Sequence, residues 1–433
     1  MKRLKTADPT RCMKCGFCMS VCPVYETDHV ETHVARGRNM LIRMARDKRL
    51  PRDKAYLSSL TYCLLCRRCE AVCIAGLSPA EITVQALREY KAQKPPTLAQ
   101  RFVNRTMVNH RSTVARLIGM AAVLPGLSVT NGKPLRHMAE AAALLTGSLA
   151  LPSPKGPFLS RRIPSHTKAA TAANPKGRVA IFAGCVFEYF MAGIGHAMVH
   201  ALAAAGFDVV YPKGLSCCGH AVRNAGDIRT ARQMAERNIE ILADYEHIVT
   251  GCATCGSALK SYGDWFDEDD PLRPAGLRLA GKVHDFSEIM DVAVNATPPA
   301  AMIGEPVTVT YHDPCHLKWH QGIGEEPRRL LAATPGIIYR EMDRADACCG
   351  LGGTFGLMHK DIGRRLQDNK MNAIAKSGAR IVATACPGCL LSLRAGIRRH
   401  GLPVRAVHIS QLLTGSGLIE AVAENPLDIA RGA

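Results

Sequence analysis

Short runs of β-branched and other apolar residues recur through the second half of the chain. Four of them are residues 179–182, 248–250, 307–311 and 381–384, and each ends at a cysteine-containing loop that leads into a helical pattern. Strand, loop and helix in this order predict parallel sheets whose functional side chains gather at the carboxyl ends of the strands. We therefore expect an α/β fold over this half of the chain.

The first hundred residues show helical rather than strand periodicity. Residues 34–46 repeat apolar side chains near helical spacing among arginines. A second amphipathic pattern over residues 78–94 opens with Ser78 and Pro79, which suit a helix cap and a first turn, and two prolines stop it. We predict a helical domain over residues 1–95.

The segment of residues 96–175 contains no cysteine and little strand signal. Residues 101–124 mix arginines and apolar residues as a basic amphipathic helix does. Its apolar run of residues 117–127 contains a proline and is shorter than the roughly 20 residues that span a bilayer, so we expect no transmembrane helix. Two interpretations stay open: a helical connector packed on its neighbours, or a helix that docks on a membrane surface or a partner.

The chain is internally duplicated from Arg178 onward. Each unit contains a strand, a CCG loop, a helix, a strand ending at CxxC, and a final strand with a histidine, in the same order. We assign residues 176–300 to the first unit and residues 301–433 to the second. The expected fold class is α+α/β: an N-terminal α-helical domain, then two duplicated α/β cysteine-rich units with parallel sheets.

The chain is strongly basic, and the excess is uneven. Its 433 residues contain 55 Lys and Arg against 37 Asp and Glu, which gives a formal charge of +18, and residues 91–170 contain twelve basic residues and one acid. Such a surface suits an acidic partner or an anionic membrane face. No recognition motif for nucleic acid accompanies the charge, so we do not expect nucleic-acid binding.

All eighteen cysteines fall into four sets with the spacing of metal clusters, and none is left over. Soft thiolates select iron-sulfur clusters, and two-residue gaps let one short loop supply three ligands to a cube. Two sets have the spacing C-x2-C-x2-C-x3-C, and two have five cysteines each. The sets are Cys12, Cys15, Cys18 and Cys22; Cys63, Cys66, Cys69 and Cys73; Cys185, Cys217, Cys218, Cys252 and Cys255; and Cys315, Cys348, Cys349, Cys386 and Cys389.

The two four-cysteine runs predict two cubane [4Fe-4S] clusters. In a two-cluster ferredoxin the fourth cysteine of each run ligates the other cluster. We therefore predict that Cys12, Cys15, Cys18 and Cys73 hold one cluster, and that Cys63, Cys66, Cys69 and Cys22 hold the second. The helical domain of residues 1–95 is thus expected to be an α-helical ferredoxin. Pro23 follows the first run as expected, but Ile74 stands at the equivalent place after the second.

Zinc and disulfides are the alternatives for these eight cysteines. Structural zinc does not require a third cysteine at x2 and a fourth at x3. The opening residues MKRLKTADPT lack the apolar region of an export signal, so we expect a reducing, cytoplasmic setting, in which cysteine-rich chains are more often metal or redox proteins than disulfide-bonded ones.

Each five-cysteine set exceeds the needs of a cubane cluster or of tetrahedral zinc. The adjacent cysteines of each CCG loop do not suit ordinary disulfide geometry, so they are better placed to bind one metal assembly together. Gly219 and Gly350 allow a tight turn beside each pair.

The double C…CCG…CxxC pattern after two ferredoxin-type runs resembles the iron-sulfur subunit of glycolate or lactate oxidase complexes, and more broadly the heterodisulfide-reductase catalytic subunit family. The stretch CCGLGGTFGLMHKDIGRRLQDNKMNAI is especially similar to the glycolate oxidase subunit. The resemblance implies one or two non-cubane [4Fe-4S] clusters, each held by one five-cysteine set. Glycolate oxidase subunits can lack the first cysteine of the last CxxC, but Cys386 is present here, which favours two loaded sites.

Several histidines lie near the cysteines of the two units. His284 and His408 occupy matching repeat positions, where a structural role is expected more often than a cluster contact. His312, His316 and His320 surround Cys315 and resemble a metal-binding trio. Because five cysteines already serve this unit, we expect at most an outer-sphere role, for His316.

The resemblance implies an electron-transfer subunit of an oxidoreductase complex. An FAD-containing 2-hydroxy-acid dehydrogenase subunit would oxidise glycolate or lactate, and this chain would pass its electrons to a quinone or another carrier, in the cytoplasm or peripherally on the inner face of the membrane. The chain has no flavin motif, so FAD is expected on the partner only. The alternative is a heterodisulfide-reductase-type catalytic subunit that reduces a disulfide at non-cubane clusters, and a zinc-stabilised scaffold is a weaker third interpretation.

Overall fold

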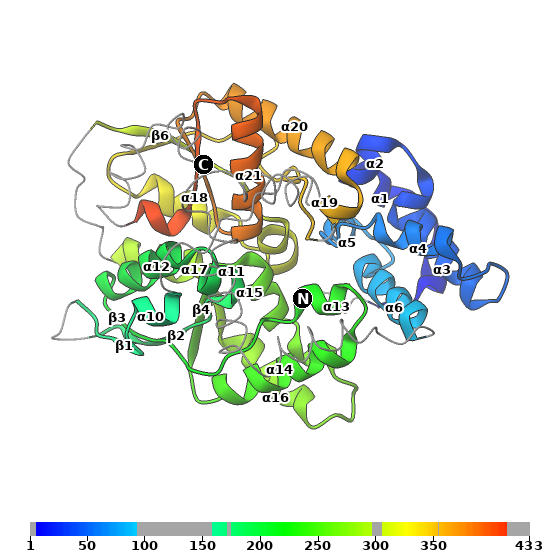
Figure 1. Ribbon diagram of the computed structural model, residues 1–433, viewed down its shortest axis with the longest axis horizontal. Coiled ribbons are helices and arrows are strands. Elements are labelled where there is room, and N and C mark those ends of the chain that lie inside the picture. Colours follow the sequence, from blue (N-terminus) through cyan, green and yellow to red (C-terminus); the bar gives the residue numbers. More distant parts are fainter. Residues whose placement is uncertain (1–5, 93–157, 171–174, 297–304, 354, 414–433) are drawn as a thin grey trace, which may run out of the picture.

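The computed structural model describes residues 6–92, 158–170, 175–296, 305–353 and 355–413. A helical N-terminal part lies against one side of two α/β units (Figure 1). The basic pattern expected over residues 101–124 lies outside the described residues. Within the described part of the chain, no helix is both long and apolar enough to cross a membrane.

The N-terminal part is helical throughout, apart from an isolated bridge between Thr6 and Leu77. Ser78 accepts a hydrogen bond from the Glu81 amide at 3.4 Å, so it caps the helix that begins at Pro79, as the sequence predicted. Ile42, on the helix of residues Ala35–Arg46, is fully buried. The elements are η1 (Pro9–Arg11), α1 (Phe17–Ser20), α2 (Pro23–Asp28), η2 (Glu31–His33), α3 (Ala35–Arg46), α4 (Lys54–Thr61), α5 (Arg68–Ala71) and α6 (Pro79–Ala92).

The first α/β unit contains a five-stranded sheet in the order β1-β3-β2-β4-β5. All neighbouring strands are parallel except β1, which pairs antiparallel with β3. The strands are β1 (His166–Thr167), β2 (Gly177–Ile181), β3 (Phe207–Val210), β4 (His247–Thr250) and β5 (Val283–Asp285).

The second unit repeats this topology without the antiparallel edge strand. Its sheet has the order β7-β6-β8-β9, and every pair is parallel. The duplication and the parallel sheets expected from the sequence are therefore confirmed. The strands are β6 (Val307–Tyr311), β7 (Ile337–Tyr339), β8 (Ile381–Thr384) and β9 (Arg405–His408).

Helices cover both sheets, as short buried parallel strands require. Those of the first unit are α10 (Leu159–Arg162), α11 (Gly184–Tyr189), α12 (Ala192–Ala204), α13 (His220–Asn224), α14 (Ile228–Leu242), α15 (Ala253–Leu259), η3 (Tyr262–Trp265), α16 (Leu272–Lys282) and α17 (Phe286–Ala296). Those of the second are the π-helix η4 (His316–Gln321), α18 (Glu325–Ala332), α19 (Phe355–Met358), α20 (Lys360–Ser377), α21 (Pro387–His400) and η5 (Ile409–Leu412).

The two units share one continuous hydrophobic core, to which both sheets contribute. Their CxxC loops meet at the boundary, where the Ala253 amide donates to the Ala385 carbonyl at 3.1 Å. The N-terminal part has its own core and joins the second unit through a separate cluster in which Leu64 packs with Phe355 and Ile362. The domain boundaries at residues 95, 175 and 300 stay predictions; α10 and β1, from the end of the expected connector, pack on the first unit.

Candidate iron-sulfur sites

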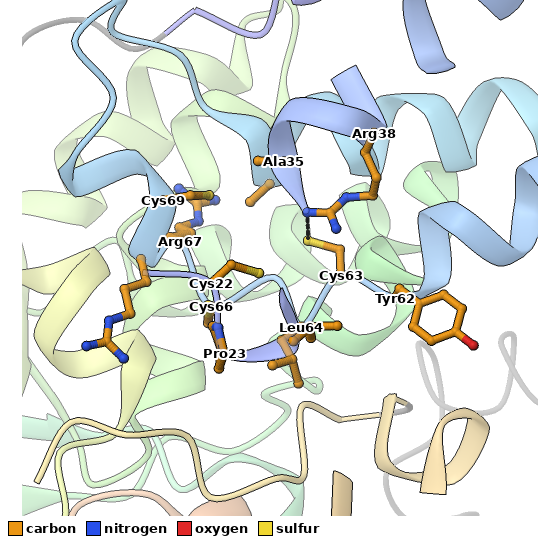
Figure 2. A pocket seen from close by; sticks show the side chains of 13 residues that line it. Cys22, Pro23, Ala35, Arg38, Tyr62, Cys63, Leu64, Cys66, Arg67 and Cys69 are labelled. Atoms are coloured by element: carbon orange, nitrogen blue, oxygen red, sulfur yellow. Dashed lines mark hydrogen bonds between the residues drawn. The ribbon is translucent and has the colours of Figure 1, made fainter. Parts of the chain in front are cut away.

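The structure brings Cys22 together with Cys63, Cys66 and Cys69 around one pocket in the N-terminal part (Figure 2). Three of these cysteines come from the second run and one from the first, which is the interleaved set that the sequence predicts. We call this group the inner set. Cys22 is the residue before α2, and Cys69 lies on the short helix α5, so both runs position their thiols with short helical turns.

A buried arginine enters the same pocket from α3. The Arg38 side chain is 2% exposed, and its Nη2 donates to the Cys63 Sγ at 3.2 Å (Figure 2). Burial by itself would lower the pKa of the Arg38 guanidinium, but the nearby thiolates of Cys63 and Cys22 raise it above its ordinary value. A cation buried among four thiols indicates that the pocket is built to hold net negative charge.

The thiols of the inner set need a compensating positive group to ionise. Burial raises the pKa of Cys66 to about 12, and it also raises the pKa values of Cys22 and Cys69. Iron supplies that positive charge when a cluster binds, because metal binding releases the thiol protons. Four soft donors around a pocket that also contains a guanidinium therefore fit an anionic iron-sulfur cluster.

The other four N-terminal cysteines differ from one another in exposure. Cys12 and Cys73 pack against the same hydrophobic cluster, Cys15 is exposed, and burial raises the pKa of Cys18. We call Cys12, Cys15, Cys18 and Cys73 the outer set. Their ligand role stays a prediction, like that of the inner set.

The five cysteines of the first unit gather at the carboxyl ends of β2 and β4. Cys185 lies at the start of α11, and Cys252 precedes α15, where its Sγ accepts from the Cys255 amide at 3.4 Å. The Cys217 carbonyl accepts from Asn238 at 3.1 Å, and the Cys218 carbonyl accepts from a buried tyrosine at 3.1 Å. These hydrogen bonds hold the adjacent cysteine pair in place.

Glycine is needed close to this set. Gly184 has a φ of +67°, and a Cβ there would lie 2.9 Å from the Cys255 Sγ. Hydrogen bonding between the Cys185 and Cys217 thiols raises the pKa of Cys185 well above its ordinary value. The first unit thus presents closely spaced thiols whose protons a bound metal group would replace.

The second unit repeats this arrangement with different supports. The Cys349 and Cys389 Sγ atoms are 3.6 Å apart, and Ser392 donates to the Cys349 carbonyl at 2.5 Å. Gly350 has a φ of +86°, and a Cβ there would lie 2.2 Å from the Gly363 carbonyl oxygen, so the predicted tight turn beside the CCG pair is present.

A lysine takes part in positioning the second CCG loop. Lys370 is fully buried, and its Nζ donates to the carbonyls of Arg344 and Ala345 at 2.8 and 3.0 Å. Burial lowers the pKa of Lys370 to about 8. It lies in the DNKMNAI stretch and supports the loop before Cys348, much as Asn238 supports the loop of the first unit.

The cysteine sites form a continuous series through the molecule. Cys66 of the inner set and Cys348 of the second unit pack against the same interdomain cluster, and the negative charge of Cys66 helps to raise the pKa of Cys315. At the other end, the thiols of Cys252 and Cys386 interact across the boundary between the units. Thiol contacts thus lead from the inner set through the second unit to the first, while the N-terminal part also contacts the first unit directly through the 2.6 Å ion pair between Arg223 and Glu81.

The histidine trio around Cys315 is dispersed by the fold. His312 turns toward Cys349 and Cys389, His320 contacts Ser257 of the first unit, and His316 stacks edge-on against His220 with ring centroids 4.7 Å apart. The trio is not a metal site. It is separated because a π-helix begins at His316 and turns successive side chains to different neighbours.

The repeat-related histidines also differ. His408 is buried, and its Nε2 lies 2.8 Å from the Gly251 carbonyl while its Nδ1 lies 2.8 Å from the Ser410 hydroxyl. It is a satisfied structural histidine that joins the two units beside Cys252. His284 instead lies 3.3 Å from His247 at the surface of the first unit.

Comparison with known proteins agrees with this architecture. The 4Fe-4S dicluster domain family matches residues 8–77, and the cysteine-rich CCG domain family matches residues 179–260 and 309–394. The chain is 31% identical over 427 residues to the probable glycolate oxidase iron-sulfur subunit of Bacillus subtilis, and the match covers 95% of each chain. This chain belongs to the family of glycolate oxidase iron-sulfur subunits.

Two other relatives match a shorter stretch of the chain or have a name that refers to another activity. The chain is 30% identical to lactate utilization protein A 2 of Bacillus mycoides over 54% of this chain and 98% of that one. It is 28% identical to a subunit of the fumarate reductase (CoM/CoB) of Methanothermobacter marburgensis over 93% of this chain and 71% of that one. Membership of the glycolate oxidase iron-sulfur subunit family supports a redox role with iron-sulfur clusters for this chain.

Sequence reasoning missed three supporting residues, which are Arg38, Lys370 and His312. Arg38 belongs to an amphipathic helix rich in arginines, and nothing in its spacing distinguishes it from Arg36 or Arg43. Lys370 lies in the stretch that carries the family resemblance, so that stretch was the available signal. The sequence indicates only that His312 is close to Cys315, because the fold rather than the spacing turns its side chain toward Cys349.

Proposed function

We propose that this chain is the electron-transfer subunit of a flavin-linked 2-hydroxy-acid dehydrogenase complex. Its partner would be an FAD-containing subunit that oxidises glycolate or lactate, and the electrons would leave to a quinone or another carrier. Iron-sulfur clusters supply one-electron chemistry when bound, whereas a flavin collects electron pairs. The observation that carries the proposal is the contact of the inner set with the second unit, and of the second unit with the first.

The residues fit this role in their burial and charge. Leu64 and Phe355 exclude water between the inner set and the second unit, and Arg38 holds positive charge at the inner set. We propose two cubane clusters, one at the outer and one at the inner set, and a non-cubane cluster at each five-cysteine set. In this proposal the protein lies on the cytoplasmic side, and its basic segment, residues 91–170, docks on an acidic partner or an anionic membrane face.

A second function is favoured by one feature. Both five-cysteine sets are complete, and the buried thiols of Cys252 and Cys386 interact at the boundary between the units, so that the two sets adjoin. This arrangement suits the heterodisulfide-reductase-type alternative.

Cluster content is tested first, on anaerobically purified full-length protein. Cys15→Ser in the outer set and Cys66→Ser in the inner set should each lower bound iron and acid-labile sulfide, with Ser59→Ala as a control that leaves both unchanged. Unchanged iron in both cysteine variants would contradict the cubane assignment. Zinc without sulfide at the five-cysteine sets would contradict the non-cubane assignment.

The two proposed functions are distinguished by the substrate that each would convert. Visible absorption of the reconstituted complex should bleach with glycolate or lactate only when an FAD-containing 2-hydroxy-acid dehydrogenase subunit is present. The chemically reduced chain alone should not turn over a small aromatic disulfide. Rapid reduction of that disulfide by the chain alone would favour the second function instead.

A further inference from the structure

His312 is a buried polar side chain that lies against thiols rather than against a nitrogen or oxygen partner. It follows the last residue of β6, and its side chain is 1% exposed. Among the residues that the structure describes, its ring nitrogens have no nitrogen or oxygen partner, and its polar contact is with the Cys349 thiol, whose pKa it helps to lower. Burying a polar group without a full set of hydrogen-bond partners is unfavourable. The position therefore indicates a group that the imidazole binds.

The neighbours of His312 are two thiols. A ring nitrogen of His312 and the Sγ atoms of Cys349 and Cys389 all lie within 4.8 Å of one another, and all three residues are buried. The two Sγ atoms are 3.6 Å apart. Tetrahedral ligands with metal–sulfur bonds of about 2.3 Å lie roughly 3.8 Å from each other, so this spacing suits donors to one metal atom.

The first unit has no equivalent nitrogen. Phe182 follows the last residue of β2 and stands three residues before Cys185, just as His312 stands three residues before Cys315. Phe182 is fully buried and packs in the common core. The duplicated sites therefore share five cysteines each but differ at this one strand end.

We propose that His312 is a nitrogen ligand of the metal group at the second five-cysteine set, beside Cys349 and Cys389. This inference rests on the proposed function only in requiring that the second set binds iron. A neutral imidazole donates less charge than a thiolate, and histidine ligation raises the potential of iron-sulfur centres. The second unit, which contacts the inner set, would then be reduced more readily than the first.

The test is pulsed electron paramagnetic resonance of the full-length protein, reduced and frozen, with and without ¹⁵N-labelled histidine. Wild type should show a strongly coupled histidine nitrogen that changes with the label. His312→Phe, which copies the first unit, should lose this coupling. His316→Phe is the matched control, because the His316 Nδ1 lies 3.8 Å from the Cys315 Sγ, and it should retain the coupling.

Two further variants keep the test decisive if His312→Phe disturbs folding. His312→Ala should recover a nitrogen coupling when imidazole is added, because the removed side chain leaves room for it. The proposal is overturned if wild type shows no strongly coupled histidine nitrogen, or if His312→Phe retains it. If Cys349→Ser removes no iron, this proposal and the non-cubane assignment both fail, while the outer and inner clusters and their electron-transfer role are unaffected.

Discussion

The two four-cysteine runs have the same spacing but very different surroundings. Met13 follows the first cysteine of the first run and is 66% exposed, whereas Leu64 follows the first cysteine of the second run and is 6% exposed. After the last cysteine, Ile74 is 51% exposed while Pro23 is buried. One run therefore forms an interdomain joint, and the other leaves apolar side chains at the surface.

Two arginines on α3 show the same contrast. Arg36 lies beside the outer set, where its Nη1 is 3.9 Å from the Met19 sulfur and its side chain is 37% exposed. Arg38 lies beside the inner set and is buried. A short cysteine motif thus specifies a loop geometry, whereas its electrostatic surroundings depend on what packs against it.

The largest expected effect concerns the interdomain joint. Leu64→Ala should lower the free energy of unfolding by about 2–4 kcal/mol, because it opens a cavity between Phe355 and Ile362. Met13→Ala should change it by less than about 0.5 kcal/mol, since that side chain is mostly exposed. Anaerobic denaturant unfolding of the two variants measures the difference. Equal losses would show that the two runs are not distinguished by burial.

The next effect concerns the reduction potential of the inner set. Reduction adds negative charge, which the buried Arg38 guanidinium stabilises, so Arg38→Met should lower the midpoint potential of one cluster. We expect at least a tenfold change in the one-electron equilibrium, or about 59 mV. Redox titration followed by electron paramagnetic resonance measures it.

Arg36→Met is the matched control for this potential, because Arg36 is on the same helix and is partly exposed. Solvent should screen most of its charge, so its loss should shift the potential much less. A shift in Arg36→Met as large as in Arg38→Met would remove the electrostatic distinction between the two sets.

The smallest expected effect is a pH dependence of the stability of the interdomain joint. Tyr62 stacks between His33 and His359, with centroid distances of 3.4 and 3.8 Å, and the Thr61 hydroxyl lies 3.0 Å from the His359 Nε2. Burial, and then the nearby His33, lower the pKa of His359 below its ordinary value of 6.5.

Because His359 binds a proton more readily in the unfolded chain than in the folded one, it favours the folded state above about pH 6.5. That contribution to the free energy of unfolding should be lost as the pH falls through the pKa of His359 in the folded protein. His359→Phe keeps an aromatic ring at the stack and should lose less stability between pH 7.5 and 5.5 than wild type. Thermal unfolding across that range measures the difference. Identical pH profiles would show that His359 does not contribute.

Much of the local structure follows from residues close together in the chain. Ser78 and Pro79 start α6, the β-branched runs form β6 and β8, and the Gly350 turn follows its cysteine pair, because capping, strand propensity and glycine turns depend on neighbouring residues. The repeat of motif order also predicted two duplicated units with parallel sheets.

The sequence by itself determined the four cysteine sets, their iron-sulfur chemistry and the class of fold, since ligand spacing and hydrophobic periodicity are local properties. Only the tertiary structure decided that Arg38 lies against the inner set, that His312 faces Cys349 rather than its own neighbours, and that Leu64 is buried while Met13 is exposed. These contacts join segments far apart in the chain. They arise from the packing of whole helices and sheets, which no short motif encodes.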